Sequence, residues 1–484
     1  MSSNDISKDN GKHIVTGIWK FRKELVPGDI YLTSKNKLVL TLYTDIDEEE
    51  ILSYDFKLKS LSSQSLNLDF VKAYELNKTL TPIYTYTPFP SIGKNIQFTV
   101  EILVLGNNLK ITQNNIKNII VRTNRQINTL FKENKTWIYK KNYIKIPRKY
   151  YTKKAKIKTR KEEFYIEFTR DINSLDIRIP DGVQFHKYTT INITSEKGLL
   201  SYKKARPLVF YLFILLSFLA KKPVLIEHIY PILKGHKHYS TEIMDSIFLK
   251  YKNNSPERFH QPLLYINNNW KLFQKIVKNY YNLSDNDRNL FYTFQLDVFF
   301  PKLPLETNFF YMMSLIDSLL NQIYAKKLKD KNDLKETLFS LQKKTSLSKD
   351  EIFQNILRCI EDEKLRKNYE KKKRSISLTD KLYLYLKENE TTTFMQRLLN
   401  TPLTPTNSPI SYSCKLLNIA HRLVDTRNSL AHNETLKFDN DLFYLFNLAK
   451  HIGLHLLLKH KLKLKENNIE IIFNNLQHNW LYYI

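Results

Sequence analysis

A short polar segment, DTRNSLAHN at 425–433, interrupts an apolar helical stretch of the sequence. It brings together the guanidinium of Arg427, the amide of Asn428 and the imidazole of His432. Asn428 and His432 are four residues apart, so a helix stacks them on one face, where the amide can orient the imidazole. The cluster therefore offers a proton carrier, an orienting group and a fixed positive charge.

These groups have the chemistry that metal-free RNA cleavage needs. In that reaction the 2′-OH of a nucleotide attacks the adjacent phosphate, so protons must move and a dianionic phosphorane must be stabilised. An imidazole, with an unperturbed pKa of about 6.5, transfers protons at neutral pH. A guanidinium holds phosphate oxygens without titrating. DNA lacks the 2′-OH and cannot react in this way.

The helix that must hold these side chains is predicted from about Tyr412 to His432. Its apolar stripe consists of Leu416, Ala420, Leu423, Val424 and Ala431. Continuing that spacing puts Arg427 on or beside the stripe, where an apolar residue is expected. An inward arginine needs partners for five donors and a charge, a cost that favours a functional site. The plain alternative is a helix that ends on a few solvated polar groups.

The other histidines and the cysteines give weaker signals. His451 and His455 have a spacing that suits zinc, but lone histidines on apolar helices are usually hydrogen-bonded core residues, and we expect packing here. His421 lies one turn before Asp425, and we expect a structural role for it rather than a place at a cleft mouth. The two cysteines, Cys359 and Cys414, build no disulfide framework, as is usual in a reducing cytosol.

The composition is that of a globular and strongly basic protein. With 484 residues, 42% of them hydrophobic, the chain can form two or three domains with a substantial core. A net charge of +28 should attract polyanions, nucleic acid ahead of acidic membranes. The N-terminus lacks the apolar core of a signal peptide. The apolar run Pro207 to Ala220 is shorter than the roughly 20 residues of a membrane span. We therefore expect a cytoplasmic protein without a membrane partner.

A period-two pattern from about Gly17 to Ile179 predicts an antiparallel sheet or sandwich. DIYLTSKNKLVLTLYT predicts a hairpin around Lys35 and Asn36. EEFYIEFTR places Phe164, Ile166 and Phe168 on one face. NIQFTVEILVL is predicted as one strand whose apolar face carries Ile96, Phe98, Val100, Ile102 and Val104.

The segment between Lys132 and Lys161 is the most basic stretch of this region. It holds 13 lysines and arginines and one acidic residue, with tyrosines interleaved. Basic side chains beside aromatic rings suit single-stranded nucleic acid, and the candidate RNA-binding residues are Lys140, Lys141, Lys145, Arg148, Lys149, Lys153 and Lys154. The alternative is a lysine-rich sheet edge that is kept charged to avoid aggregation.

After Ser201 the pattern becomes helical and is predicted to stay so. RPLVFYLFILLSFLA at 206–220 predicts a core helix, and Trp270 to Tyr281 an amphipathic one. A long helix is predicted from Glu306 to about Leu328. Its stripe consists of Phe309, Met312, Met313, Ile316, Leu319, Leu320 and Ile323. A lysine-rich segment, 364–374, precedes the last helices, and the prolines of 401–410 predict a loop.

The segment RLVDTRNSLAHN resembles the Arg-Asn-x3-His signature of HEPN-domain ribonucleases, in the DTRN…H form of ApeA-like anti-phage proteins. TGIWKFRKELVPGDIYLTSKNKLVLTL is similar to the opening of the ApeA N-terminal domain, and RPLVFYLFILLSFLAKKPV to its central apolar segment. NFFYMMSLIDSLL resembles the first HEPN helix, and TTTFMQRLLNTPL the stretch before the catalytic helix. The likeness covers most of the chain, but only the Arg-Asn-His motif is specific.

The resemblance implies an α+β chain with three parts. A β-rich, sandwich-like sensing or regulatory domain spans 1–200, a helical connection 201–300 and an all-α HEPN ribonuclease bundle 301–484. Such bundles dimerise so that both motifs face one cleft, and they cut RNA, often tRNA, without a metal or other cofactor. Arg427, Asn428 and His432 match the catalytic motif, with Asp425 in support. Asp317 stands where the family usually has a glutamate, either as a partner of Arg427 or on the solvent edge of its helix.

The function expected from these observations is a metal-independent endoribonuclease of phage defence, with RNA as substrate and a phage-encoded protein as trigger. Two alternatives remain. One is a non-catalytic RNA-binding module in which the bundle only dimerises and the segment 132–161 holds RNA. The other is the toxin of a toxin–antitoxin pair. Neither a glycine-rich phosphate loop nor a nucleophile elbow occurs in the sequence, which argues against an NTPase and a serine hydrolase.

Overall fold

A computed structural model shows a chain of two compact units, Met1–Asn282 and Leu283–Ile484. The boundary falls inside the segment 201–300, which the sequence analysis predicts as a helical connection. The structure describes residues 12–21, 24–34, 36–44, 59–61, 71–73, 82–85, 94–99, 102–106, 115–123, 125–131, 138–140, 143–145, 151–158, 163–176, 184–196, 198–235, 241–249, 261–324, 377–400, 412–432 and 441–475.

The first unit contains a six-stranded antiparallel sheet with the order β4-β1-β2-β3-β7-β6. Its strands are β1 (Lys12–Phe21), β2 (Glu24–Leu32), β3 (Leu38–Thr44), β4 (Lys59–Leu61), β6 (Pro82–Thr85) and β7 (Lys94–Thr99). The hairpin predicted around Lys35 and Asn36 is confirmed, because β2 and β3 pair with Leu32 opposite Leu38. Asn36 has a φ of 55°, a left-handed conformation that asparagine tolerates in turns.

An eight-stranded sheet follows, with the order β12-β13-β14-β9-β15-β16-β8-β5 and antiparallel pairing throughout. Its strands are β5 (Val71–Ala73), β8 (Ile102–Gly106), β9 (Ile116–Thr123), β12 (Tyr151–Lys158), β13 (Glu163–Asp176), β14 (Gln184–Ser195), β15 (Ile226–Leu233) and β16 (Thr241–Asp245). The predicted apolar face of EEFYIEFTR is confirmed, since Phe164, Ile166 and Phe168 are all buried. A separate two-stranded hairpin consists of β10 (Ile138–Lys140) and β11 (Tyr143–Lys145).

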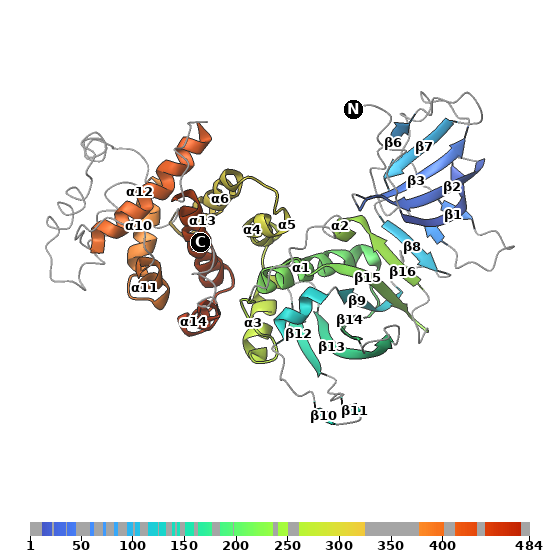
Figure 1. Cartoon of the computed structure of the whole chain (residues 1–484), viewed down its shortest axis with the longest axis horizontal. Helices are drawn as coiled ribbons and strands as arrows, with labels where there is room; N and C mark the ends of the chain where they lie inside the picture. The colour runs from blue at the N-terminus through green and yellow to red at the C-terminus, as the bar shows by residue number, and fades with distance from the viewer. Residues whose placement is uncertain are drawn as a thin grey trace. The chain divides into compact units, whose positions relative to one another are not determined.

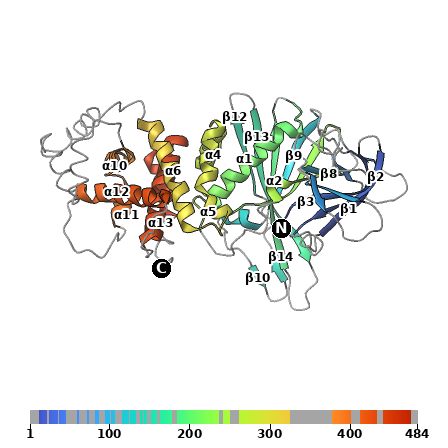
Figure 2. The same ribbon diagram turned by 90° about the horizontal axis from the view of Figure 1, so that it is seen from above.

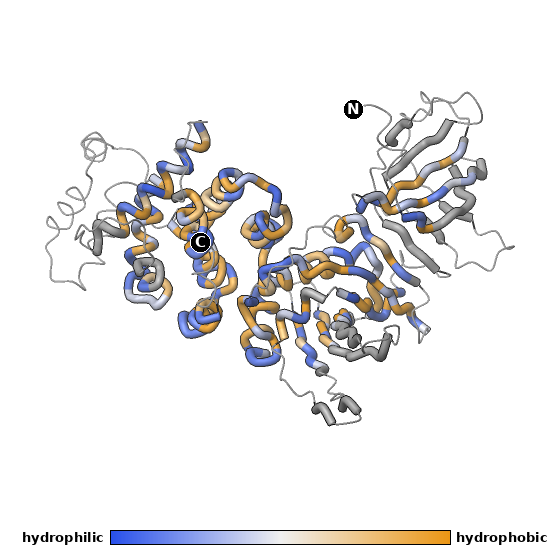
Figure 3. Tube along the Cα trace, viewed as in Figure 1, coloured by the Kyte–Doolittle hydropathy of each residue, from blue (hydrophilic) through white to orange (hydrophobic). Residues whose placement is uncertain are grey.

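Helices cover the buried face of the eight-stranded sheet. They are α1 (Tyr202–Ala220), α2 (Ser246–Leu249), α3 (Trp270–Tyr281) and the 3-10 helix η4 (Arg125–Leu130). Phe164 and Phe168 meet α3 edge-to-face, at ring-centroid distances of 5.1 Å from Tyr281 and 5.4 Å from Phe273. Figure 1 shows α1 running along the sheet, and Figure 3 colours much of this helix as hydrophobic. The predicted core helix and the predicted amphipathic helix are thus both confirmed.

A buried ion pair fastens α1 to the end of β16. The carboxylate of Asp245 is fully buried and accepts hydrogen bonds from Arg206 Nε at 2.6 Å and Arg206 Nη2 at 2.9 Å. The Tyr202 hydroxyl donates to the same carboxylate at 2.9 Å. This fork-shaped pairing matches the geometry of guanidinium and carboxylate, and the tyrosine uses a further lone pair, so the buried charges are compensated.

Two sequence predictions for this unit are wrong. The pattern does not stay helical after Ser201, because β15 and β16 join the sheet beside β9 and β8. NIQFTVEILVL is not one strand either. Its first part lies in β7, paired with β3 in the six-stranded sheet, and its second part lies in β8, paired with β16 in the other sheet. Each half of this segment alternates as a strand should. Alternation predicts a strand but does not indicate which sheet the strand joins.

The described part of the second unit is helical. Its elements are α4 (Asp285–Phe294), α5 (Leu296–Phe299), α6 (Leu305–Tyr324), α10 (Leu378–Glu388), α11 (Thr393–Asn400), α12 (Tyr412–Ala431), α13 (Asp441–Leu456), the π-helical turn η5 (Leu457–Lys461) and α14 (Glu466–Asn474). The predicted stripe of α6 is buried except for Ile323, which is half-buried. The predicted segments 364–374 and 401–410 lie outside the described residues.

Helix α6 packs against α12, α13 and α10. Gly453 allows the close approach of α13, because a Cβ atom at this position would lie 3.0 Å from the Met312 sulfur. A capping box begins α10, in which the Ser377 hydroxyl accepts from the Asp380 amide and the Asp380 carboxylate accepts from the Ser377 amide. Figure 2 shows α12 running across α6. The chain therefore combines antiparallel sheets with helices, as the predicted α+β class requires.

In the ranges that the structure describes, no helix is both long enough and apolar enough to cross a membrane.

Candidate functional site

The polar motif lies in the last turns of α12. The earlier turns are anchored in the unit by Leu416, Ala420, Leu423 and Val424, which are all buried. No residue between Asp425 and His432 is buried. Ala431, predicted on the apolar stripe, is exposed. The stripe therefore ends after Val424, and the motif occupies a helix end that is held in place but open to solvent.

Arg427 is half-buried and lies against α6. Its guanidinium carbon is 5.8 Å from the ring centroid of Phe310, and its Nη1 donates to the Asn428 side-chain oxygen at 3.2 Å. Its Nε is shielded from solvent and has no hydrogen-bond acceptor within the part of the chain that the structure describes. Among the described residues no carboxylate comes within ion-pair distance of this guanidinium. Its positive charge is consequently positioned but not neutralised.

Asn428 and His432 are both exposed. The backbone N–H of His432 donates to the Asn428 carbonyl at 3.1 Å, so the two residues continue the helical spacing. The side-chain oxygen of Asn428 accepts from Arg427, not from the imidazole. The structure thus brings the guanidinium and the amide together and leaves the imidazole accessible at the helix end. In this arrangement Asn428 orients Arg427.

Asp317 is half-buried on α6 and does not meet Arg427. Its carboxylate accepts from the Asn321 amide at 3.0 Å, and the Asn321 oxygen accepts from Lys381 Nζ at 2.5 Å. This chain of contacts leads along α6 toward α10, while Arg427 lies beside Phe310, two turns earlier on α6. Asp425 is exposed on α12. The predicted supporting acids therefore do not form an ion pair with the arginine of the motif.

The predicted RNA-binding residues are only partly described. Lys140 lies in β10, Lys145 in β11, and Lys153 and Lys154 in β12, whereas Lys141, Arg148 and Lys149 fall outside the described residues. The ammonium of Lys154 lies 4.0 Å from the ring centroid of Tyr165, and that of Lys153 lies 6.0 Å from that of Trp270. Both contacts place lysine against an aromatic ring of the same unit.

The next lysines of β12 pair with acids. Lys156 Nζ lies 2.8 Å from Glu196, and Lys158 Nζ lies 2.8 Å from Glu163, whose pKa Lys158 helps to lower to about 2. Strand β12 stands at one end of the eight-stranded sheet. These pairings fit a charged sheet edge whose lysines are balanced locally. RNA binding by this segment stays a prediction.

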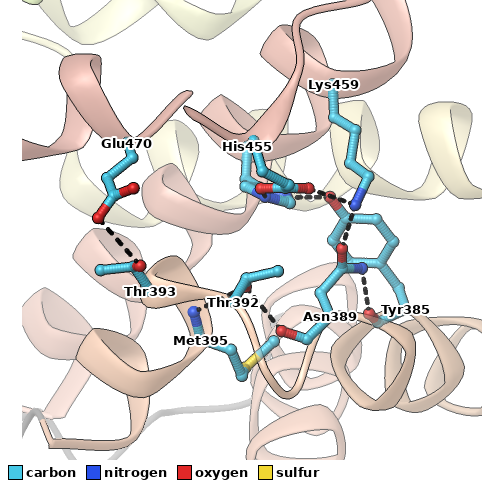
Figure 4. Close-up of polar contacts among 9 residues, drawn as sticks. Tyr385, Asn389, Thr392, Thr393, Met395, His455, Lys459 and Glu470 are labelled. Carbon is cyan, nitrogen blue, oxygen red and sulfur yellow. Dashed lines mark hydrogen bonds and ion pairs between the residues drawn. The ribbon is translucent and has the colours of Figure 1, made fainter. Parts of the chain in front are cut away.

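A second polar cluster lies inside the helical unit, around His455 of α13. The imidazole is fully buried and stacks on Phe394 at a centroid distance of 4.2 Å and an interplanar angle of 10°. Its Nδ1 is hydrogen-bonded to the Tyr385 hydroxyl, and its Nε2 lies 3.6 Å from the Glu466 carboxylate. Figure 4 shows His455 and Tyr385 facing each other across α13 and α10. The packing role predicted for His455 is confirmed.

Lys459 of the π-helical turn closes this cluster. Its ammonium lies 2.6 Å from the Glu466 carboxylate. It also donates to the Asn389 oxygen at 2.6 Å (Figure 4). The Asn389 amide in turn donates to the Tyr385 carbonyl at 2.6 Å. Burial lowers the pKa of His455, while the contacts with His455 and Lys459 lower the pKa of Glu466 to about 2. The cluster holds α10, α13 and α14 together.

Within the described ranges no group of three or more histidine, cysteine, aspartate or glutamate side chains gathers in a way that could hold a metal ion. His451 forms a hydrogen bond between its Nδ1 and the Asn447 carbonyl at 2.5 Å. This local contact, like the burial of His455, is the packing that the sequence predicts for the pair.

Sequence reasoning missed Phe310. The residue belongs to the same face of α6 as Asp317, because the two are seven residues apart. A helical wheel therefore indicates the correct face but not the residue that meets Arg427, since that depends on where α12 crosses α6.

A scan against protein-family models, a search of curated proteins and a search of solved structures each found no match. Membership in the family of HEPN ribonucleases therefore stays a prediction, which rests on the Arg-Asn-x3-His motif.

Proposed function

We propose that the protein is a metal-independent endoribonuclease whose catalytic residues are Arg427, Asn428 and His432. The observation that carries the proposal is the open end of α12. There a guanidinium that pairs with no carboxylate of the described residues and an exposed imidazole share the last turns of one helix, which a buried stripe anchors. An un-neutralised cation attracts a phosphate, and an exposed imidazole can reach the proton of a bound 2′-OH.

The reaction balances with the substrate's own atoms. The 2′-oxygen loses its proton and bonds to the adjacent phosphorus, the bond from phosphorus to the 5′-oxygen breaks, and the leaving 5′-oxygen gains a proton. The products are a 2′,3′-cyclic phosphate and a 5′-hydroxyl. His432 acts as general base or acid, and Arg427 stabilises the charge of the phosphorane. Asn428 orients Arg427 through the hydrogen bond between their side chains.

The same proposal includes how the helical unit dimerises and how the first unit controls it. The helices of the second unit form a HEPN bundle that dimerises through its motif-bearing face, so that two copies of α12 border one cleft. The β-rich first unit, sandwich-like in its arrangement of strands, senses a phage-encoded protein or holds the enzyme inactive. A ribonuclease that cuts host RNA, with tRNA the first substrate class to test, needs such control. The place of action is the cytoplasm.

The test measures cleavage of a mixed RNA by the full chain, purified with and without the phage trigger present during expression, in buffer that contains a chelator. Wild type should cleave RNA and leave DNA of the same sequence intact, and His432→Ala should be inactive. His228→Ala is the matched control, because His228 is a half-exposed histidine of the first unit that pairs with Glu242 at 2.5 Å. Equal activity of wild type and His432→Ala would overturn the proposal. RNA binding without cleavage in every preparation would favour the non-catalytic alternative.

A further inference from the structure

The surroundings of Arg427 differ from those of a typical structural arginine. A buried or half-buried guanidinium is usually paired with a carboxylate, as Arg206 is with Asp245. Arg427 instead has the aromatic ring of Phe310 at 5.8 Å and the neutral amide of Asn428 at 3.2 Å. The predicted carboxylate, Asp317, is engaged with Asn321.

The two kinds of partner have different effects on a cation. A carboxylate holds a guanidinium in place but cancels its charge. The negative face of an aromatic ring attracts the guanidinium and leaves the net positive charge intact. For a residue that must stabilise a dianionic phosphorane, only the second arrangement keeps the full charge available.

Phe310 is suited to this role by its place in α6. Its neighbour Phe309 is fully buried, and Met313 and Ile316 anchor the following turn. The Phe310 backbone carbonyl also accepts from the Ser314 hydroxyl at 2.9 Å. The Phe310 ring is half-buried, so one part of it is available to Arg427 while the helix that carries it is fixed.

We propose that Phe310 is a positioning residue, whose ring holds the Arg427 guanidinium toward the scissile phosphate without neutralising it. This inference rests on the proposed ribonuclease function and adds to it a residue outside the Arg-Asn-x3-His motif. Phe310 acts only through Arg427 and does not touch the reacting atoms.

The test is a double-mutant cycle on the steady-state kinetics of RNA cleavage, with Phe310→Leu, Arg427→Ala and both together. Phe310→Leu should lower kcat about threefold to thirtyfold with KM nearly unchanged, because the contact matters in the transition state. In the Arg427→Ala background, Phe310→Leu should have no further effect. Phe310→Trp should retain or exceed wild-type kcat, since tryptophan is the strongest cation–π partner.

Phe309→Leu is the matched control for loss of an aromatic ring in α6. It should lower thermal stability and leave kcat unchanged at temperatures where the chain is folded. An equal loss from Phe310→Leu with and without Arg427 would overturn the inference, and so would wild-type kcat in Phe310→Leu. Failure of the proposed function is a separate result, because in that case wild type itself shows no cleavage that depends on His432.

Discussion

Two arginines of this chain have opposite surroundings. Arg206 in the first unit meets the fully buried Asp245 in a two-pronged ion pair that Tyr202 completes. Arg427 in the second unit meets a ring and an amide, and no carboxylate of the described residues pairs with it. The first arrangement cancels charge and stabilises the fold, whereas the second preserves charge at an open helix end.

Two histidines show the same difference. His455 is fully buried between Tyr385, Phe394 and Glu466, so its position is fixed. His432 is exposed at the end of α12. Exposure and missing charge partners, rather than residue type or spacing, therefore separate a site that can meet a substrate from a cluster that holds helices together.

The largest effect that this comparison predicts is the loss of stability when Arg206 loses its carboxylate partner. Asp245→Ala should destabilise the first unit by about 3 kcal/mol, because the largely shielded Arg206 guanidinium and the Tyr202 hydroxyl both lose their buried acceptor. Hydrogen exchange of α1 and β16 in the full chain measures this loss. Glu242→Gln, on the same strand but in a half-exposed pair with His228, should cost less than about 1 kcal/mol. Similar losses from the two variants would contradict the distinction.

Replacement of Arg427 should instead affect the cleavage rate strongly and the stability only slightly. Arg427→Ala should lower the cleavage rate by roughly 10²–10³, the usual loss for a group that stabilises transition-state charge. Its effect on stability should stay within about 0.5 kcal/mol, because no buried partner is left unpaired. Thermal unfolding and cleavage are measured on the same sample, with Arg288→Ala, a paired arginine of α4, as control. A large loss of stability with normal cleavage would place Arg427 among the structural residues.

Acid should weaken the second unit through the His455 cluster. The pKa of His455 is lowered in the folded state, so the unfolded chain takes up the proton first as the pH falls below 6.5, and stability decreases. The pKa of Glu466 is lowered from 4.5 to about 2, so its contribution disappears between these pH values. After allowance for solvent screening, the Glu466 step should be about 1 kcal/mol.

Hydrogen exchange of α13 as a function of pH follows both steps. Glu466→Gln should remove the lower step and keep the upper one. Exchange in α13 that does not change between pH 7 and pH 3, or a lower step that persists in Glu466→Gln, would show that the cluster does not contribute in this way.

The smallest effect is expected on the basic sheet edge. Lys156 is half exposed and lies between Glu196 at 2.8 Å and Glu163 at 3.7 Å. Lys156→Met should therefore change stability by less than about 0.5 kcal/mol and leave RNA affinity and its salt dependence unchanged. A fall in RNA affinity with a smaller salt slope would instead identify β12 as a nucleic-acid surface.

Periodicity predicted most of the local structure but not its assembly. The alternation in β13 and the stripes of α1, α3 and α6 each reflect one buried face, and such a face is visible in a single sequence. Strand β15 alternates as well, but the prediction that the pattern stays helical after Ser201 did not recognise this short strand behind a long apolar helix. The division of NIQFTVEILVL between two sheets depends on partners that are distant in sequence.

For the candidate site, likewise, the sequence predicted the residues but not their surroundings. Arg427, Asn428 and His432 were predicted from their residue chemistry and from the resemblance to the Arg-Asn-x3-His signature. Their exposure and the contact of Arg427 with Phe310 depend on where α12 ends its contact with α6, which is set by the packing of the whole helical unit. For Asp317 the sequence left two alternatives open, a partner of Arg427 or the solvent edge of its helix, and in the structure its carboxylate accepts from Asn321.

The chemistry of the RNA ends tests the central proposal most directly. RNA from cells that express wild type or His432→Ala, with and without phage infection, is sequenced by methods that distinguish 2′,3′-cyclic phosphate and 5′-hydroxyl ends from 3′-hydroxyl and 5′-phosphate ends. Wild type should generate new cyclic-phosphate and 5′-hydroxyl ends that are missing with His432→Ala. New 5′-phosphate ends, or the same ends from both proteins, would contradict cleavage by the residues at the end of α12.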